Sequence, residues 1–208
     1  LAALSHEAAV QLLGKTGELV HDYANGRDEE PVTAVNPDDP GKSIGSGQTF
    51  SRNLAGLAEI SSAVSFLSDR VGTQLRHQNA YCQAVQVVIK RPDLTCISRQ
   101  KQLPAPTCST KRIAEQALEI ITTAWDSNQP IRMLTVTALG ITNSATAVEP
   151  RQLSFFEPET EADNRTAALE ATVDELRGRF GRSAVIPGGS LLPDLGLQER
   201  KQAEKLPW

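Results

Sequence analysis

The stretch RPDLTCISRQKQLPAP, residues 91–106, restricts the possible folds of this chain more than any other segment. It is typical of an extended strand that ends in Pro-x-Pro. A strand with one face against a core alternates apolar and polar residues, and this one hardly does so. We therefore expect a sheet with one covered face and one face turned toward a polar, anionic partner. The polar residues of the stretch are Thr95, Ser98, Arg99, Gln100, Lys101 and Gln102.

Two amphipathic helices and three more strands flank this segment. Residues 54–78 place apolar side chains at steps of three and four, and a second helical pattern follows the N-cap candidates Thr107 to Thr110 and ends near Trp125. The order β-α-β-β-α-β predicts an α+β module with a four-stranded sheet and both helices on one face. The other strands are predicted at 43–50, 82–90 and 131–139. The stripe of the first helix consists of Leu57, Ile60, Val64, Leu67, Val71 and Leu75.

The charge is distributed unevenly along the chain. Residues 1–40 carry two cations and eight anions, residues 41–149 carry eleven and seven, and residues 150–208 carry eight and ten. The middle segment therefore has a net charge of +4, although the whole chain has −4. A basic segment is the usual electrostatic footprint of a phosphate-binding surface, but an excess of this size also fits scatter around neutrality.

The cysteines and histidines predict neither a disulfide framework nor a metal site. Cys82, Cys96 and Cys108 are odd in number and lack CxxC spacing, and the three histidines lie far apart. We expect buried or half-buried thiols in a reducing cytoplasm, and no cofactor in this chain. No apolar run has membrane-spanning length, and no signal peptide is recognisable. The chain begins at Leu1 inside a helical pattern, which suggests a fragment of a longer protein.

The module is predicted to extend over residues 43–141. Residues 1–32 form a small helical unit before it, and residues 33–42 form a linker that is rich in proline and acidic side chains. Within the helical unit, a glycine turn at residues 14–17 interrupts the helical pattern. Such a turn can point free N–H groups at a phosphate, and it can equally be an ordinary break between two helices.

Residues 142–208 form a tail with one apolar motif. Gln152-Leu-Ser-Phe-Phe156 places two Phe residues directly before an acidic run. An exposed apolar pair is unfavourable unless it enters a pocket, which could belong to a partner or to the chain's own domain. A helix is predicted at 164–180, and residues 185–208 are predicted to be poorly ordered. The stripe of that helix consists of Leu169, Val173, Leu176 and Phe180.

Five motifs, in this order, resemble the C-terminal part of the Y-family, lesion-bypass DNA polymerases of the bacterial polymerase IV/UmuC type. They run through the module that this family calls the little finger, and residues 1–32 resemble the end of its thumb. As a set they are specific, although each one alone would be weak. The motifs are Lys42-Ser-Ile-Gly45 with Thr49-Phe50, Arg70-Val-Gly-x-Gln-Leu-Arg76, Val85-x-Val-x-Ile89, Ser98-Arg99-x-x-x-Leu103-Pro-x-Pro-Thr107 and Pro130-Ile-Arg132.

The resemblance implies that the thumb and the little finger grip the template–primer duplex through its backbone phosphates. Such contacts carry no sequence information, which suits a polymerase that accepts any template. The family's catalytic carboxylates hold Mg²⁺ in the palm domain, so the resemblance implies no catalytic or metal-binding residue here and no polymerase activity for the fragment alone. The implied DNA contacts are Lys15, Gly17, Ser43, Gly45, Ser46, Ser98, Arg99, Lys101 and Arg132.

The motif in the tail resembles the sliding-clamp-binding pentapeptide of bacterial polymerases. Its second position is Leu, as in that family, and its fourth position is Phe155 where the family commonly has Leu. The resemblance therefore implies the sliding clamp (beta subunit) as a partner, beside duplex DNA. The implied clamp contacts are Gln152, Leu153, Phe155 and Phe156.

Two other functions fit the same pattern of strands and helices. A non-catalytic adaptor that binds DNA and the clamp would need the same modules without a palm. An RNA-binding module with the order β-α-β-β-α-β would stack bases on strand aromatics. Residues 94–102 contain no aromatic residue and Tyr81 precedes its strand, so the RNA-binding function ranks last.

Overall fold

The computed structural model describes residues 1–32, 41–143, 161–186, 188 and 195–197. The chain divides into two compact units, Leu1–Asp39 and Pro40–Trp208. The first is a helical hairpin of α1 (His6–Leu13) and α2 (Lys15–Ala24).

Two local features define the hairpin of the first unit. The Ser5 Oγ accepts a hydrogen bond from the N–H of Ala8 at 3.2 Å, which caps the start of α1. Gly14 ends α1 and begins α2 with φ of +63°, a conformation that favours glycine. The predicted glycine turn is therefore the joint between the two helices.

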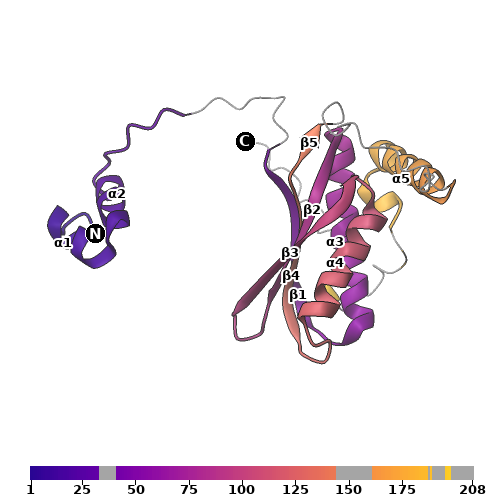
Figure 1. Ribbon diagram of the computed structural model, residues 1–208, viewed down its shortest axis with the longest axis horizontal. Coiled ribbons are helices and arrows are strands. Elements are labelled where there is room, and N and C mark those ends of the chain that lie inside the picture. Colours follow the sequence, from indigo (N-terminus) through magenta and orange to yellow (C-terminus); the bar gives the residue numbers. More distant parts are fainter. Residues whose placement is uncertain (33–40, 144–160, 187, 189–194, 198–208) are drawn as a thin grey trace. The chain divides into compact units, whose positions relative to one another are not determined.

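The second unit is built on an antiparallel sheet with the spatial order β1-β4-β2-β3 (Figure 1). Each helix connects two strands that point the same way and skips the strand between them. The predicted α+β order and four-stranded sheet are confirmed. The elements are β1 (Ser43–Leu54), α3 (Gly56–His77), β2 (Ala80–Lys90), β3 (Cys96–Thr107), α4 (Thr110–Ala124) and β4 (Ile131–Leu139).

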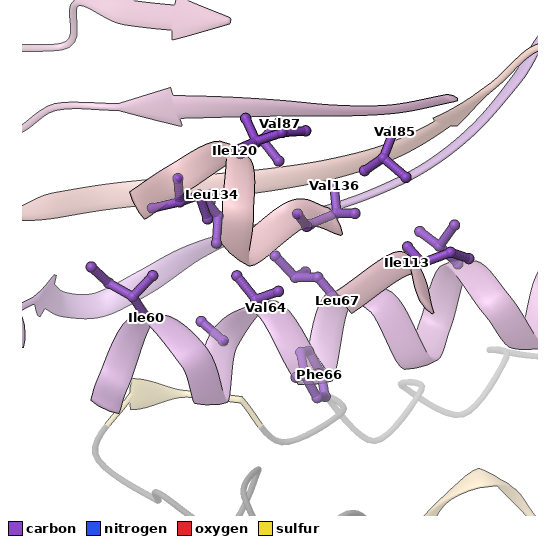
Figure 2. Close-up of a cluster of buried hydrophobic side chains, with 14 of the residues drawn as sticks. Ile60, Val64, Phe66, Leu67, Val85, Val87, Ile113, Ile120, Leu134 and Val136 are labelled. Atoms are coloured by element: carbon purple, nitrogen blue, oxygen red, sulfur yellow. The ribbon is translucent and has the colours of Figure 1, made fainter. Parts of the chain in front are cut away.

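Both α3 and α4 cover the same face of the sheet (Figure 1). The apolar stripe of α3 turns toward the strands, where Val85 and Val87 of β2 meet Leu134 and Val136 of β4 (Figure 2). All but one of the predicted stripe residues of α3 are fully buried. The exception is Leu57, which lies in the first turn and keeps 48% of its surface exposed, because the helix starts at the rim of the core.

A tight turn joins β2 to β3, as Pro92-Asp93 predicts. The carboxylate of Asp93 accepts hydrogen bonds from the backbone N–H (2.9 Å) and the hydroxyl (2.6 Å) of Thr95. These bonds hold the pKa of Asp93 below its ordinary value, since they favour the ionised form. Leu94 takes a positive φ of 72°, and the N–H of Arg91 donates to the carbonyl of Thr95 across the turn.

The three thiols lie in different environments. Cys82 is buried in the core, and burial raises the pKa of its thiol to about 12. Cys108 is half-buried, but Cys96 is exposed at the start of β3. The prediction of buried or half-buried thiols is therefore wrong for Cys96, because an edge strand leaves its first side chain in solvent.

The tail adds further elements to the second unit. Strand β5 (Thr142–Asn143) pairs with the start of β2, and α5 (Glu161–Phe180) contains the predicted helix. A 3-10 turn, η1 (Arg182–Ala184), follows α5.

The prediction of poor order after residue 185 is wrong for residues 195–197. Leu195 and Leu197 are fully buried and belong to the same hydrophobic core. Between them Gly196 has φ of +68°, and a Cβ there would lie 2.6 Å from the Ser51 Oγ. Two leucines around such a glycine bury enough apolar surface to hold the segment on the domain.

Candidate nucleic-acid interface

The register of the sheet defines its uncovered surface, which we call the open face. Residues that pair across antiparallel strands share a face, so the pairs assemble into rows that cross all four strands. None of the side chains in these rows is acidic, and Lys90 is the single cation among them. The four rows, each read from β1 through β4 and β2 to β3, are Ser43–Leu139–Ala84–Gln102, Gly45–Thr137–Gln86–Gln100, Gly47–Thr135–Val88–Ser98 and Thr49–Met133–Lys90–Cys96.

Two glycines of β1 lie beside two threonines of β4 on the open face. A Cβ at Gly45 would lie 2.9 Å from the Thr137 Oγ1, and a Cβ at Gly47 would lie 2.6 Å from the Thr135 Oγ1. The glycines therefore make room for the threonine side chains of the neighbouring strand. This packing was not predicted from the sequence, because the register of β1 against β4 is a long-range property.

The rows on the other face are apolar in the centre, and their edge positions hold both apolar and polar side chains. Ser46 pairs with Val136, and Gln48 pairs with Leu134, so their side chains share the face that the helices cover. The Ser46 Oγ is buried and has no hydrogen-bond partner within the described residues. Of the implied phosphate contacts on β1, the structure thus places Ser43 and Gly45 on the open face, but not Ser46.

The edge strand β3 separates three implied DNA contacts onto two faces. Ser98 pairs with Val88 of the open face. Arg99 pairs with the buried Val87, and Lys101 pairs with the buried Val85, so both cations share the helix-covered face at the edge of the sheet. All three side chains are exposed, since β3 is an edge strand.

The two cations of β3 have near neighbours. The Lys101 Nζ donates to the Glu119 Oε1 of α4 at 2.6 Å. That bond, with a second one from Gln116, holds the pKa of Glu119 below its ordinary value. The Arg99 guanidinium donates to the carbonyl of Ser98 at 2.8 Å. Both Arg99 and Lys101 remain exposed, so an incoming phosphate can reach them.

The remaining implied contacts lie elsewhere. Arg132 is the exposed second residue of β4. In the helical unit, Lys15 is exposed at the start of α2. Gly17 is buried, its N–H donates to the carbonyl of Gly14 at 2.8 Å, and a Cβ there would clash with the carbonyl of Ala9. The structure therefore gives Gly17 a packing role between α1 and α2.

The clamp-binding candidates Gln152, Leu153, Phe155 and Phe156 lie outside the described residues. Within the described part of the chain, no group of three or more His, Cys, Asp or Glu side chains is arranged to hold a metal ion. None of the described helices is long and apolar enough to cross a membrane.

An ion-pair cluster that the sequence did not predict fixes α5 to α3. The Arg76 guanidinium of α3 contacts the Asp174 Oδ2 (2.6 Å) and the Glu170 Oε2 (3.0 Å) of α5, and also donates to the carbonyl of Cys108 (3.1 Å). In return, the Arg177 guanidinium of α5 pairs with the Asp69 Oδ2 of α3 at 2.9 Å. In the first contact α3 supplies the arginine, and in the second α5 supplies it. Because each helix carries both a cation and its partner's anion, the two contacts set both the position and the orientation of α5.

The cluster also changes the proton affinity of its central cation. Burial disfavours the charged form of Arg76, but the hydrogen bond from Arg76 to Asp174 and the charges of Glu170 and Asp174 outweigh burial. The pKa of Arg76 therefore lies above its ordinary value. In the sequence, the spacing of Glu170, Asp174 and Arg177 shows that they share one side of a helix. It does not show which segment of the chain they contact.

The fold and the open face define an α+β module whose uncovered sheet surface is polar apart from a few apolar residues of β2 and β4, has no acidic side chain in its four rows and lies opposite the helices. The sequence profile of the impB/mucB/samB family C-terminal domain matches residues 41–155. The chain belongs to this family, and it is a homologue of the Y-family enzyme DNA polymerase IV.

Two curated relatives agree with this assignment. DNA polymerase IV of Acetivibrio thermocellus is 34% identical over 197 residues, which cover 95% of this chain and 48% of that protein. DNA polymerase IV of Clostridium kluyveri is 30% identical over 198 residues, which cover 92% of this chain and 48% of that protein. A solved Y-family DNA polymerase chimera, Dbh-Dpo4(243-245)-Dbh, aligns over 67% of this chain and 39% of that chain, with 17% identity and a TM-score of 0.46. The chain spans about half the length of the curated relatives it matches.

Proposed function

We propose that this chain is the duplex-gripping and clamp-docking part of an error-prone translesion DNA polymerase that acts in the bacterial cytoplasm. The main observation behind the proposal is the open face. Neither α3 nor α4 covers this face, and its four rows contain no acidic side chain. A carboxylate on such a surface would repel a phosphate, whereas hydroxyls, amides and backbone N–H groups can donate to it.

The chemistry of the open face suits a partner of any sequence. Ser43, Ser98 and Thr137 offer hydroxyl groups, and Gly45 and Gly47 of β1 are exposed beside the threonines of β4. Arg99 and Lys101 add charge on the edge strand β3, and Arg132 adds charge near the start of β4. Lys15 adds charge from the helical unit. Phosphate contacts of this kind fix the position of a duplex without reading its bases.

The clamp contact follows from the motif at residues 152–156. Leu153, Phe155 and Phe156 would enter a hydrophobic pocket of the sliding clamp, and Gln152 would bond at its rim. Clamp capture by the 208-residue chain tests this proposal, with a Phe155→Ala, Phe156→Ala double variant as the comparison. Capture at wild-type strength by the double variant would contradict the proposed contact.

The parent polymerase would carry out nucleotidyl transfer with Mg²⁺ bound by carboxylates of its palm. The described residues do not fit that role, since they hold no suitable cluster of ligands. The contribution of this chain is positional: it would hold the template–primer duplex while the reaction takes place elsewhere in the enzyme.

The DNA contact is tested by titrating the chain with a fluorescent duplex over a range of salt concentrations. Arg99→Ala should weaken binding and reduce the slope of log K against log salt by about one, because one phosphate contact is lost. Arg112→Ala is the matched control, since Arg112 is an exposed arginine on α4, in the helix layer. Binding that is insensitive to salt, or equal losses for both variants, would contradict the phosphate contact at the sheet.

A further inference from the structure

A groove lies on the outer side of the helix layer, between α3, α4 and α5. Its volume is about 520 Å³, within the range of cavities that bury several apolar groups. Most of its wall is aliphatic, and the polar part of the wall includes the ion pairs that hold α5. The apolar wall includes Val64, Ala114, Leu118, Leu169, Val173 and Ile186.

The groove has defined walls, because ion pairs fix the second half of α5 to α3. Arg76 binds Glu170 and Asp174, and one turn further on Arg177 binds Asp69. The Arg177 guanidinium also donates to the carbonyl of Val185 at 2.9 Å, which holds the chain after α5 against the same wall.

The wall is left partly open to solvent in the described part of the chain. Leu169 projects from α5 with 63% of its surface exposed, and Ile186 is also exposed. Apolar side chains that gather around an open groove are unfavourable in water unless another apolar group covers them. We therefore expect an apolar group to occupy the groove.

The chain itself supplies such an occupant within reach. Leu153, Phe155 and Phe156 lie shortly before Glu161, where α5 begins. Six extended residues span up to about 20 Å, which is the reach of Phe155 from the start of α5. Thr166, on the groove wall, lies only about 7.5 Å along the helix from Glu161. The motif can therefore fold back onto α5 and place its side chains in the groove.

We propose that the groove holds Leu153, Phe155 and Phe156 of the same chain whenever no clamp is bound. This intramolecular contact competes with clamp docking, because the same side chains cannot fill both sites. The competition with the clamp rests on the proposed clamp function. The binding of the motif in the groove, which we call the seat, does not depend on that function.

The seat is tested first without any clamp, by methyl NMR on the 208-residue chain. A Leu153→Ala, Phe155→Ala, Phe156→Ala variant should shift the methyl signals of Leu118 and Val173, which line the groove. The methyl signals of Leu134 and Val136, in the core beneath the sheet, should stay in place. Unchanged groove signals would overturn the proposal. Groove shifts in the wild type that depend on protein concentration would overturn it too, in favour of a second copy as the occupant.

The competition is tested by titrating a bacterial sliding clamp into single variants. Leu169→Glu places a carboxylate on the groove wall, at an exposed position where the fold tolerates it. It should tighten clamp binding by about five- to tenfold, as expected if the seat is filled for most of the time. Phe180→Glu is the matched control, since Phe180 lies on the same helix with 65% exposure and does not line the groove. Its clamp affinity should equal that of the wild type.

The outcomes separate the two proposals. If the wild type binds the clamp and Leu169→Glu binds it equally well, the seat is overturned and the clamp function stands. If neither the wild type nor a synthetic peptide of residues 150–158 binds the clamp, the clamp function fails. In that case the NMR result alone decides whether the groove holds the motif.

Discussion

Helix α3 carries two stripes of side chains that hold two different neighbours. Leu67 belongs to the stripe that packs against the sheet (Figure 2). This stripe, which also includes Val71, is fully buried and aliphatic from Ile60 onward. Asp69 and Arg76 belong to the other stripe, which binds α5 through ion pairs and hydrogen bonds. Both stripes repeat at steps of three and four residues, so periodicity alone does not distinguish them.

The contact of α3 with the sheet can be predicted from a sequence, but its contact with α5 cannot. Apolar burial is non-directional, so any aliphatic stripe predicts that some apolar surface will cover it. An ion pair needs a particular partner at a particular distance, and the stripe of Asp69 and Arg76 looks like an ordinary solvated face until α5 is in place.

The largest effect is expected on the apolar stripe. Leu67→Ala removes a fully buried side chain from the centre of the core and should lower the free energy of unfolding by about 3 kcal/mol, because a cavity remains. Chemical denaturation of the chain measures this loss. Leu57→Ala, on the same helix but half-exposed, is the control and should cost much less. Equal losses of stability for the two variants would contradict the distinction between the buried stripe and the rim of the core.

The polar stripe should show a smaller and more local effect. Arg76→Ala leaves the Asp174 and Glu170 carboxylates without their cation, at a loss of about 2 kcal/mol after discounting for the 16% exposure of the Arg76 side chain. Hydrogen exchange should rise along α5 and change little in β2 and β4.

Two further variants test whether the effect on α5 is specific to the ion pairs of Arg76. Gln74→Ala changes an exposed residue of the same helix and should leave α5 protected. Adding Asp174→Ala and Glu170→Ala to Arg76→Ala should recover part of the lost stability, because no uncompensated charge remains in the contact. A triple variant less stable than Arg76→Ala alone would show that the hydrogen bonds from the Thr73 and Ser109 hydroxyls to these carboxylates outweigh the unpaired charge.

The open face offers a third kind of contact, a close fit between neighbouring strands. Gly47→Ala brings a Cβ within 2.6 Å of the Thr135 Oγ1 and should destabilise the domain by about 1 kcal/mol, as overpacking does. Thr135→Ala in the same chain should relieve most of this loss, which thermal denaturation of the two single variants and the double variant can measure. Additive losses would contradict the fit.

The smallest effect is expected at the exposed pair of Lys101 and Glu119. The hydrogen bond from Lys101 depresses the pKa of Glu119, so the contribution of the pair is present above the unfolded-state pKa and is lost as the pH falls through the folded one. An NMR titration of the Glu119 carboxyl should therefore show a midpoint below its ordinary value. Lys101→Ala should raise that midpoint only partly, since the bond from Gln116 remains. An unchanged midpoint would mean that the pair is not formed in solution.

The sequence predicted the parts of the fold that depend on local patterns. The stripe of α3, the alternation in β2 and β4 and the turn at Asp93 each follow from residues close together in the chain. The register that places Ser98 on one face and Arg99 on the other comes from the pairing of β3 with β2, and the alternation of polar residues in β3 was too weak to reveal it.

The candidate site was predictable in part for the same reason. Ser43 and Gly45 were named from their motif, and the structure places both on the open face. Ser46 and Gly17 were named from the same resemblance, but a motif does not show that one hydroxyl is buried and that one glycine packs against a helix. The burial of Leu195 and Leu197 was missed, because two leucines around a glycine resemble any short loop.

The strand order has a consequence for how the domain is made. β1 pairs only with β4 among the described strands, and β4 is the last of the four to be synthesised. On a ribosome, β1 must wait with its backbone groups unpaired until Leu139 has emerged, and one of the two central strands of the sheet is missing until then. Folding is thus tied to the completion of a long-range pairing, which predicts slow folding and a period during synthesis in which an unpaired edge needs protection from aggregation.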